Sequence, residues 1–127
     1  MRNKLRLFVL LTVALLTGSF AGAQQTTKIP RLCYLAPYPV AELPPVTAAG
    51  LTVYDAFLRG LRDLGYVEGQ SITIDYLSAD GQFERFPVLA KECLRLQADM
   101  IMVGTTPAAR AAKHANQTIP IVLFGIG

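Results

Sequence analysis

Apolar and polar residues alternate along the chain in a way that predicts strands and helices in turn. Short apolar runs rich in β-branched residues predict strands, and apolar residues at intervals of three and four predict helices. We predict strands at residues 31–36, 71–76, 100–103 and 119–124. We predict helices at residues 51–64, 83–97 and 107–116. This order, β-α-β-α-β-α-β, predicts an α/β fold with a doubly wound parallel sheet.

The first 23 residues have the pattern of a secretory signal peptide. A basic start precedes an apolar run from Leu7 to Leu16, and Ala21-Gly22-Ala23 fits the site that a signal peptidase cleaves. The apolar run is too short for a membrane span, which takes roughly 20 residues. We therefore expect residues 1–23 to be removed and residues 24–127 to fold outside the cytoplasm.

Composition and charge then exclude several classes of partner. The whole chain has 12 basic and 9 acidic residues, but Arg2, Lys4 and Arg6 lie in the predicted signal, so the mature chain is neutral. A neutral chain gives no basic face for nucleic acid or for an anionic membrane. His114 is the only histidine, and metal-ligand spacing is absent, so we predict neither a metal site nor a cofactor.

Two cysteines, Cys33 and Cys93, remain in the mature chain. In an exported protein they could form a disulfide, whereas buried cysteines also occur as free thiols. A helix packed on a sheet places its backbone about 8 Å from the strand, beyond the limit of about 6.8 Å between the Cα atoms of a disulfide. We therefore predict two packed thiols.

Open parallel sheets bind ligands at the carboxyl ends of their strands, where the strand order reverses. The loops that follow the predicted strands are residues 37–38, 77–82, 104–107 and 124–127. The candidate ligand-binding residues in these loops are Tyr38, Asp80, Gly104, Thr105, Thr106 and Gly125. No nucleophile motif or neighbouring base accompanies them, so we assign no catalytic residue.

The loop at residues 104–107, Gly-Thr-Thr-Pro, carries the most informative chemistry. It supplies a flexible strand end, two hydroxyls at a helix start, and a proline suited to the first helical position. The amides of Ala108 and Ala109 would then point outward with the positive end of the helix dipole, where a carboxylate or other anion is favoured. An ordinary helix cap explains the same residues. Both interpretations stay open at this point.

Five stretches of the sequence match motifs of a known family. They are FLRGLRDLGYVEGQ (57–70), SITIDY (71–76), ADGQFERFP (79–87), ADMIMVGTTPAARAAK (98–113) and TIPIVL (118–123). Together they resemble the periplasmic ABC-transporter substrate-binding proteins of the tryptophan- or tyrosine-transporter-like kind. The resemblance covers nearly all of residues 28–127. Leu77, where arginine is common, and Tyr38, where a small residue is usual, depart from the pattern.

This resemblance implies two doubly wound lobes that close around a small ligand, which is then passed to a membrane permease. Residues 24–127 would be the first lobe of a longer periplasmic protein, C-terminally incomplete. Thr105 and Thr106 would hold a ligand carboxylate, and Asp80 and Tyr38 would flank the cleft. The implied ligand is an amino acid or related carboxylate, with no enzymatic activity. A ligand-sensing receptor module and a periplasmic α/β enzyme are the alternatives.

Overall fold

The computed structural model describes residues 27–125, so the predicted signal at 1–23 lies outside the described part of the chain. The strands are β1 (Arg31–Ala36), β2 (Thr73–Ser78), β3 (Met100–Val103) and β4 (Ile121–Leu123). The α-helices are α2 (Val53–Asp63), α3 (Phe86–Arg95) and α4 (Thr106–Ala115), and two short 3-10 turns are η1 (Val40–Glu42) and η2 (Phe83–Arg85). Within residues 27–125, no helix combines the length and apolar character that crossing a bilayer requires.

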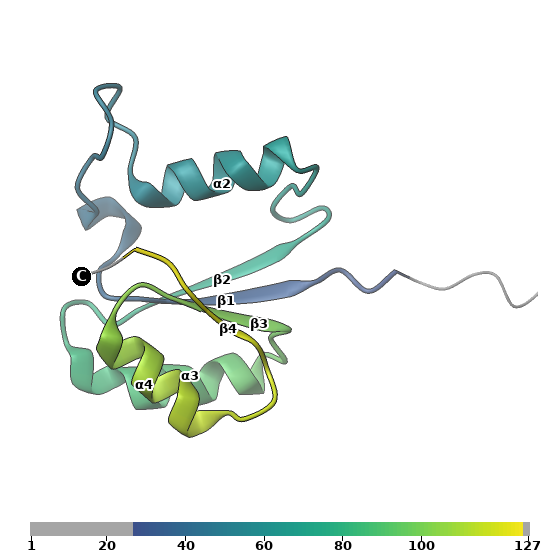
Figure 1. Ribbon diagram of the computed structural model, residues 1–127, viewed down its shortest axis with the longest axis vertical. Coiled ribbons are helices and arrows are strands. Elements are labelled where there is room, and N and C mark those ends of the chain that lie inside the picture. The colour runs from purple at the N-terminus through teal and green to yellow at the C-terminus, as the bar shows by residue number, and fades with distance from the viewer. Residues whose placement is uncertain (1–26, 126–127) are drawn as a thin grey trace, which may run out of the picture.

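The four strands form one parallel sheet in the order β2-β1-β3-β4. Helix α2 covers one face of this sheet, and α3 and α4 cover the other (Figure 1). The predicted α/β fold with a doubly wound parallel sheet is therefore confirmed. The chain passes from β1 to β2 on one side and then returns to β3 on the other, so the strand order reverses between β1 and β3.

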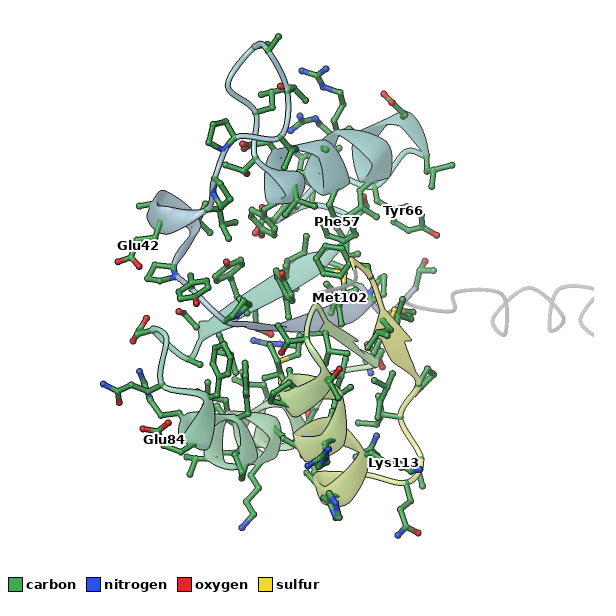
Figure 2. All side chains as sticks on the ribbon, turned by 60° about the vertical axis from the view of Figure 1, so that its left-hand side comes forward. Glu42, Phe57, Tyr66, Glu84, Met102 and Lys113 are labelled. Carbon is green, nitrogen blue, oxygen red and sulfur yellow. A yellow bond between two sulfur atoms is a disulfide. The ribbon has the colours of Figure 1, made fainter. Side chains whose placement is uncertain are left out.

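The alternation of side chains along β1 builds a core on each face of the sheet. Leu32 and Tyr34 face α2, where they join an aromatic and aliphatic cluster. Cys33 and Leu35 face α3 and α4 and are completely buried among small and apolar residues. Figure 2 shows Phe57 and Met102 filling the layer between α2 and the sheet. Burial on both faces explains why these strands are apolar without polar alternation.

Several element boundaries differ from the sequence prediction by one to three residues, and two of them have a clear local cause. Strand β2 begins at Thr73 rather than at residue 71, because Ser71 closes a turn: its hydroxyl accepts a hydrogen bond from the amide of Val67 at 2.8 Å. Helix α3 begins at Phe86 rather than at residue 83, because residues 83–85 form a separate 3-10 turn. Pro87 then occupies the first turn of α3, where its missing amide proton is not needed.

Cys33 and Cys93 form a disulfide that ties β1 to α3, so the prediction of two free thiols was wrong. Their Cα atoms are 5.7 Å apart, well inside the range of a disulfide. The prediction used an average distance between helix and sheet. Near Cys93 the buried neighbours include Ala90 and Ala98, and such small side chains let this helix approach the strand more closely than average.

The amino ends of the strands are held by ion pairs. The Arg31 guanidinium donates two hydrogen bonds to the Asp75 carboxylate, at 2.6 and 3.0 Å, and so joins β1 to β2. Asp99, just before β3, accepts from the Lys28 ammonium at 2.6 Å and from the Arg31 amide at 2.8 Å. These two bonds, with Lys28 contributing most, lower the pKa of Asp99. Arg31 therefore connects the three strands at their amino edge.

Candidate functional site

The carboxyl edge of the sheet gathers the four loops that follow the strands. The amide of Gly81, in the loop after β2, donates to the Pro37 carbonyl, in the loop after β1, at 2.8 Å. The hydroxyl of Tyr76, within β2, donates to the Tyr38 carbonyl of the same loop at 2.7 Å. The loops after β3 and β4 meet at Gly104, since a Cβ placed there would lie 3.6 Å from the Phe124 carbonyl oxygen. These loops surround the point where the strand order reverses, which is where open parallel sheets bind ligands.

Thr105 acts as the cap of α4. Its hydroxyl accepts a hydrogen bond from the Ala108 amide at 3.3 Å, and the Ala109 amide donates to the Thr105 carbonyl at 3.0 Å. Of the two interpretations that the sequence left open, these bonds favour the ordinary helix cap, because the helix itself uses the Ala108 and Ala109 amides. The Thr105 hydroxyl can still donate its proton. Thr106 is exposed on the first turn of α4 and offers a second hydroxyl.

Asp80 is engaged within its own loop. Its carboxylate accepts from the Ser78 hydroxyl at 2.7 Å and from the Arg85 guanidinium at 2.6 Å. These two bonds, with Ser78 contributing most, lower the pKa of Asp80. The residue has a left-handed backbone, with φ of 54°, which aspartate and asparagine adopt more readily than most residues. Asp80 thus shapes the loop after β2, and half of its side chain remains exposed.

This arrangement predicts a pH dependence of stability. Because the pKa of Asp80 in the folded protein is below its usual 3.8, the carboxylate contributes stability above about pH 4 that is lost as the pH falls through the folded pKa. Asp80→Asn tolerates the same backbone and removes this charge. We expect the free energy of unfolding of wild type and variant to converge on acidification below pH 4, measured by urea unfolding at several pH values. Parallel pH profiles would contradict the assignment.

Tyr38 and Phe83 form an exposed aromatic pair at the same edge. Tyr38 is 43% exposed and Phe83 38% exposed, and their ring centroids lie 6.4 Å apart at an edge-to-face angle. Gly81 lies beneath the tyrosine, because a Cβ at this position would be 3.4 Å from the Tyr38 ring. The sequence pattern indicates Tyr38 as a candidate but not Phe83. A lone phenylalanine at a helix start gives no signal of a surface partner.

Gly104 and Gly125 have different local roles. Gly125 has a φ of 70°, and a Cβ there would meet nothing within 4 Å. Glycine at this position therefore allows the left-handed backbone of the turn after β4 and is not required by lack of space. Gly104 does not have a left-handed backbone. A Cβ on Gly104 would lie only 3.3 Å from the hydroxyl oxygen of Tyr34, a residue that sequence analysis assigned to a strand and not to the site.

A groove of about 470 Å³ lies between α3 and α4. Phe83 and Thr106 line its end at the carboxyl edge, and Lys91, Arg110 and His114 lie along it. His114 is exposed. Within residues 27–125, no group of three histidine, cysteine or carboxylate side chains is arranged to hold a metal ion. The polar groups at the edge are hydroxyls, backbone carbonyls and the ion-paired side chains of Asp80 and Arg85.

Comparisons with known proteins agree with this architecture. Residues 45–127 match the family described as ABC transporter substrate binding protein. A tyrosine-binding protein of Clostridioides difficile (strain R20291) is 31% identical over 70 residues, which are 55% of this chain and 20% of that protein. The chain thus spans a small part of this relative's length.

Solved structures show the same fold. A conserved domain protein from Vibrio cholerae has a TM-score of 0.65 at 26% identity. A substrate binding protein with adhesive properties from Clostridium difficile, in a ligand-free open form, has a TM-score of 0.63 at 21% identity. A Streptococcus protein in complex with L-Trp has a TM-score of 0.58 at 19% identity. Each likeness covers 78% of this chain and 31% of the other chain.

Proposed function

Because this chain belongs to the ABC transporter substrate-binding protein family, we propose that it is the first lobe of a two-lobed extracytoplasmic receptor, which captures a small ligand and delivers it to a membrane permease. The observation that carries the proposal is the convergence of four loops on the carboxyl edge of the sheet, around the reversal of strand order. The role is binding and not catalysis: relatives are described as substrate-binding proteins.

The ligand we propose is an amino acid or a closely related carboxylate. The hydroxyls of Thr105 and Thr106 lie at the start of α4, where the helix dipole favours negative charge. Hydrogen bonds from hydroxyls to a carboxylate are charge-assisted and stronger than neutral ones. The C. difficile relative is named for tyrosine, and the Streptococcus structure contains L-Trp, which supports the same ligand class for this chain.

The periplasm is the compartment we propose. A disulfide between Cys33 and Cys93 persists in an oxidising environment and is rare in the cytoplasm. Both cysteines are completely buried, which fits a structural bond better than a reversible one. The signal-peptide pattern at residues 1–23 supports export through the inner membrane before folding.

The proposal predicts the effect of removing the two hydroxyls. Replacing Thr105 and Thr106 together by valine in the full-length protein should weaken binding of an amino acid by about 1–3 kcal/mol, since a buried carboxylate would lose its hydrogen bonds. Thr105→Val should also lower stability without ligand by about 1 kcal/mol, because the cap of α4 is lost. Calorimetric titration measures the first effect and thermal unfolding the second.

Thr105→Ser is the matched control, because serine keeps the oxygen that accepts from the Ala108 amide. We expect this variant to retain both affinity and stability. If the double valine variant bound the amino acid as tightly as the wild type, the start of α4 would be excluded from the ligand site. If the wild type bound none of the twenty standard amino acids, the proposed ligand class would be wrong.

A further inference from the structure

Tyr34 is a buried residue with an unused polar group. It lies on the central strand β1 and is only 3% exposed. Within residues 27–125 its hydroxyl makes no hydrogen bond, and in the same part of the chain no fully buried polar side-chain atom lacks a partner. Within this part of the chain the hydroxyl is therefore available to a partner that the fold does not supply.

The ring of Tyr34 is fixed by aromatic neighbours. Its centroid lies 5.0 Å from that of Tyr76 and 5.1 Å from that of Phe124, both in edge-to-face contact. The ring of Tyr54 stacks on it at 6.1 Å. These contacts come from β2, from the end of β4 and from α2. The position of the hydroxyl is consequently set by the fold before any ligand arrives, which lowers the entropic cost of binding.

Gly104 allows this hydroxyl to lie against its backbone. Its backbone is not left-handed, so another residue could adopt the same conformation. A Cβ would, however, lie 3.3 Å from the Tyr34 hydroxyl oxygen and 3.6 Å from the Phe124 carbonyl oxygen. The first distance is tighter than ordinary van der Waals contact. The absence of a side chain at Gly104 therefore lets the Tyr34 hydroxyl and the Phe124 carbonyl lie close to its backbone.

Tyr34 and Gly104 lie at the point where the strand order reverses. Tyr34 belongs to β1 and Gly104 follows β3, and these neighbouring strands pair directly, with Tyr34 opposite Met102. Gly104 also precedes Thr105, the cap of α4. The Tyr34 hydroxyl and the two threonine hydroxyls thus approach the carboxyl edge from opposite faces of the sheet.

We propose that Tyr34 is a ligand-contacting residue, whose hydroxyl, held beside the Gly104 backbone, donates a hydrogen bond to the carboxylate of the bound amino acid. The inference rests on the proposed function, because it assigns a further contact in the same cleft. Burial raises the pKa of Tyr34 to about 12, so the hydroxyl keeps its proton and remains a donor at neutral pH.

The test compares Tyr34→Phe with the wild type in the full-length protein. The twenty standard amino acids are first screened by thermal shift, and the tightest is titrated calorimetrically together with its α-amide, which lacks the carboxylate charge. For the amino acid we expect the affinity to fall about 10- to 100-fold, as for a hydrogen bond to a charged group. For the amide we expect a change of less than about threefold, since a neutral acceptor gains less from this donor.

Tyr66→Phe is the matched control. Tyr66 is 43% exposed and lies at the opposite end of the molecule from Glu42 and Glu84, which mark the carboxyl edge (Figure 2). Tyr66→Phe should bind the amino acid with the affinity of the wild type. Gly104→Ala should weaken binding of the amino acid, because its Cβ would lie 3.3 Å from the Tyr34 hydroxyl oxygen and displace it. Tyr34→Phe should leave ligand-free thermal stability unchanged, since the lost hydroxyl has no partner within residues 27–125.

Two results would overturn the inference. Unchanged affinity of Tyr34→Phe for the amino acid would remove Tyr34 from the site while leaving the proposed function intact. An equal loss of affinity for acid and amide, accompanied by lower stability, would mean that the hydroxyl only supports the fold. If the wild type binds no amino acid, the proposed function fails first and the inference fails with it.

Discussion

Replacing both Cys33 and Cys93 by alanine is expected to lower the free energy of unfolding by about 4 kcal/mol. The disulfide joins residues 60 positions apart and so closes a long loop in the unfolded chain. Loss of this restraint raises the conformational entropy of the unfolded state, and the effect grows slowly with loop length. Both side chains are completely buried, so the loss of sulfur packing adds to the change.

Urea unfolding of the full-length protein, as wild type and as the double alanine variant, measures the difference. Mass spectrometry after alkylation of the denatured protein provides the matched check of the bond itself. Without reductant no alkyl group should be added, and after reduction two should be added. Two alkyl groups without reductant would show that the thiols are free, and equal unfolding midpoints would show that the bond does not restrain the unfolded chain.

Phe86→Ala is expected to destabilise the protein by about 3–5 kcal/mol, the range for removing a phenylalanine from a close-packed core. Phe86 is the first residue of α3, is completely buried, and belongs to the cluster that contains the disulfide. Alanine at this position leaves a cavity that its neighbours fill only in part. Thermal or urea unfolding without ligand measures the loss.

Val88→Ala on the same helix is the control, because Val88 is 70% exposed. Its effect should stay within about 0.5 kcal/mol, as for most surface substitutions. A similar loss for Phe86→Ala and Val88→Ala would contradict the assignment of Phe86 to the core. In the double alanine variant that lacks the disulfide, Phe86→Ala should lower the free energy of unfolding by a different amount than in the wild type, since the effects of residues in one cluster are not additive.

The sequence predicts the fold well because each strand and helix has a strong local signal. Residues 100–103, for example, are entirely apolar, as a strand covered on both faces requires, and β3 has these bounds. The strand order between β2, β1 and β3 follows from the short right-handed crossovers of a doubly wound sheet. Local pattern and topology together therefore determine which loops meet at the carboxyl edge.

Distances between elements could not be predicted in the same way. The separation of Cys33 from Cys93 depends on which small residues lie between strand and helix, and on the tilt of the helix, neither of which has a local signal. The contacts within the candidate site could not be predicted from the sequence either. Sequence analysis placed Asp80 at the edge but not its bond to Arg85. The sequence places Tyr34 only in a strand, because a tyrosine between leucines is typical of a buried core position.

The ion pairs that join the amino ends of the strands lie at the opposite edge from the loops of the candidate site. Substitutions in those loops therefore leave the bonds of Arg31 to Asp75 and of Lys28 to Asp99 untouched. Binding loops on a scaffold that is stabilised elsewhere can vary without loss of the fold. During divergence from a common ancestor, such a lobe can acquire a new ligand preference by changing a few loop residues, while selection for stability acts on a separate set of positions.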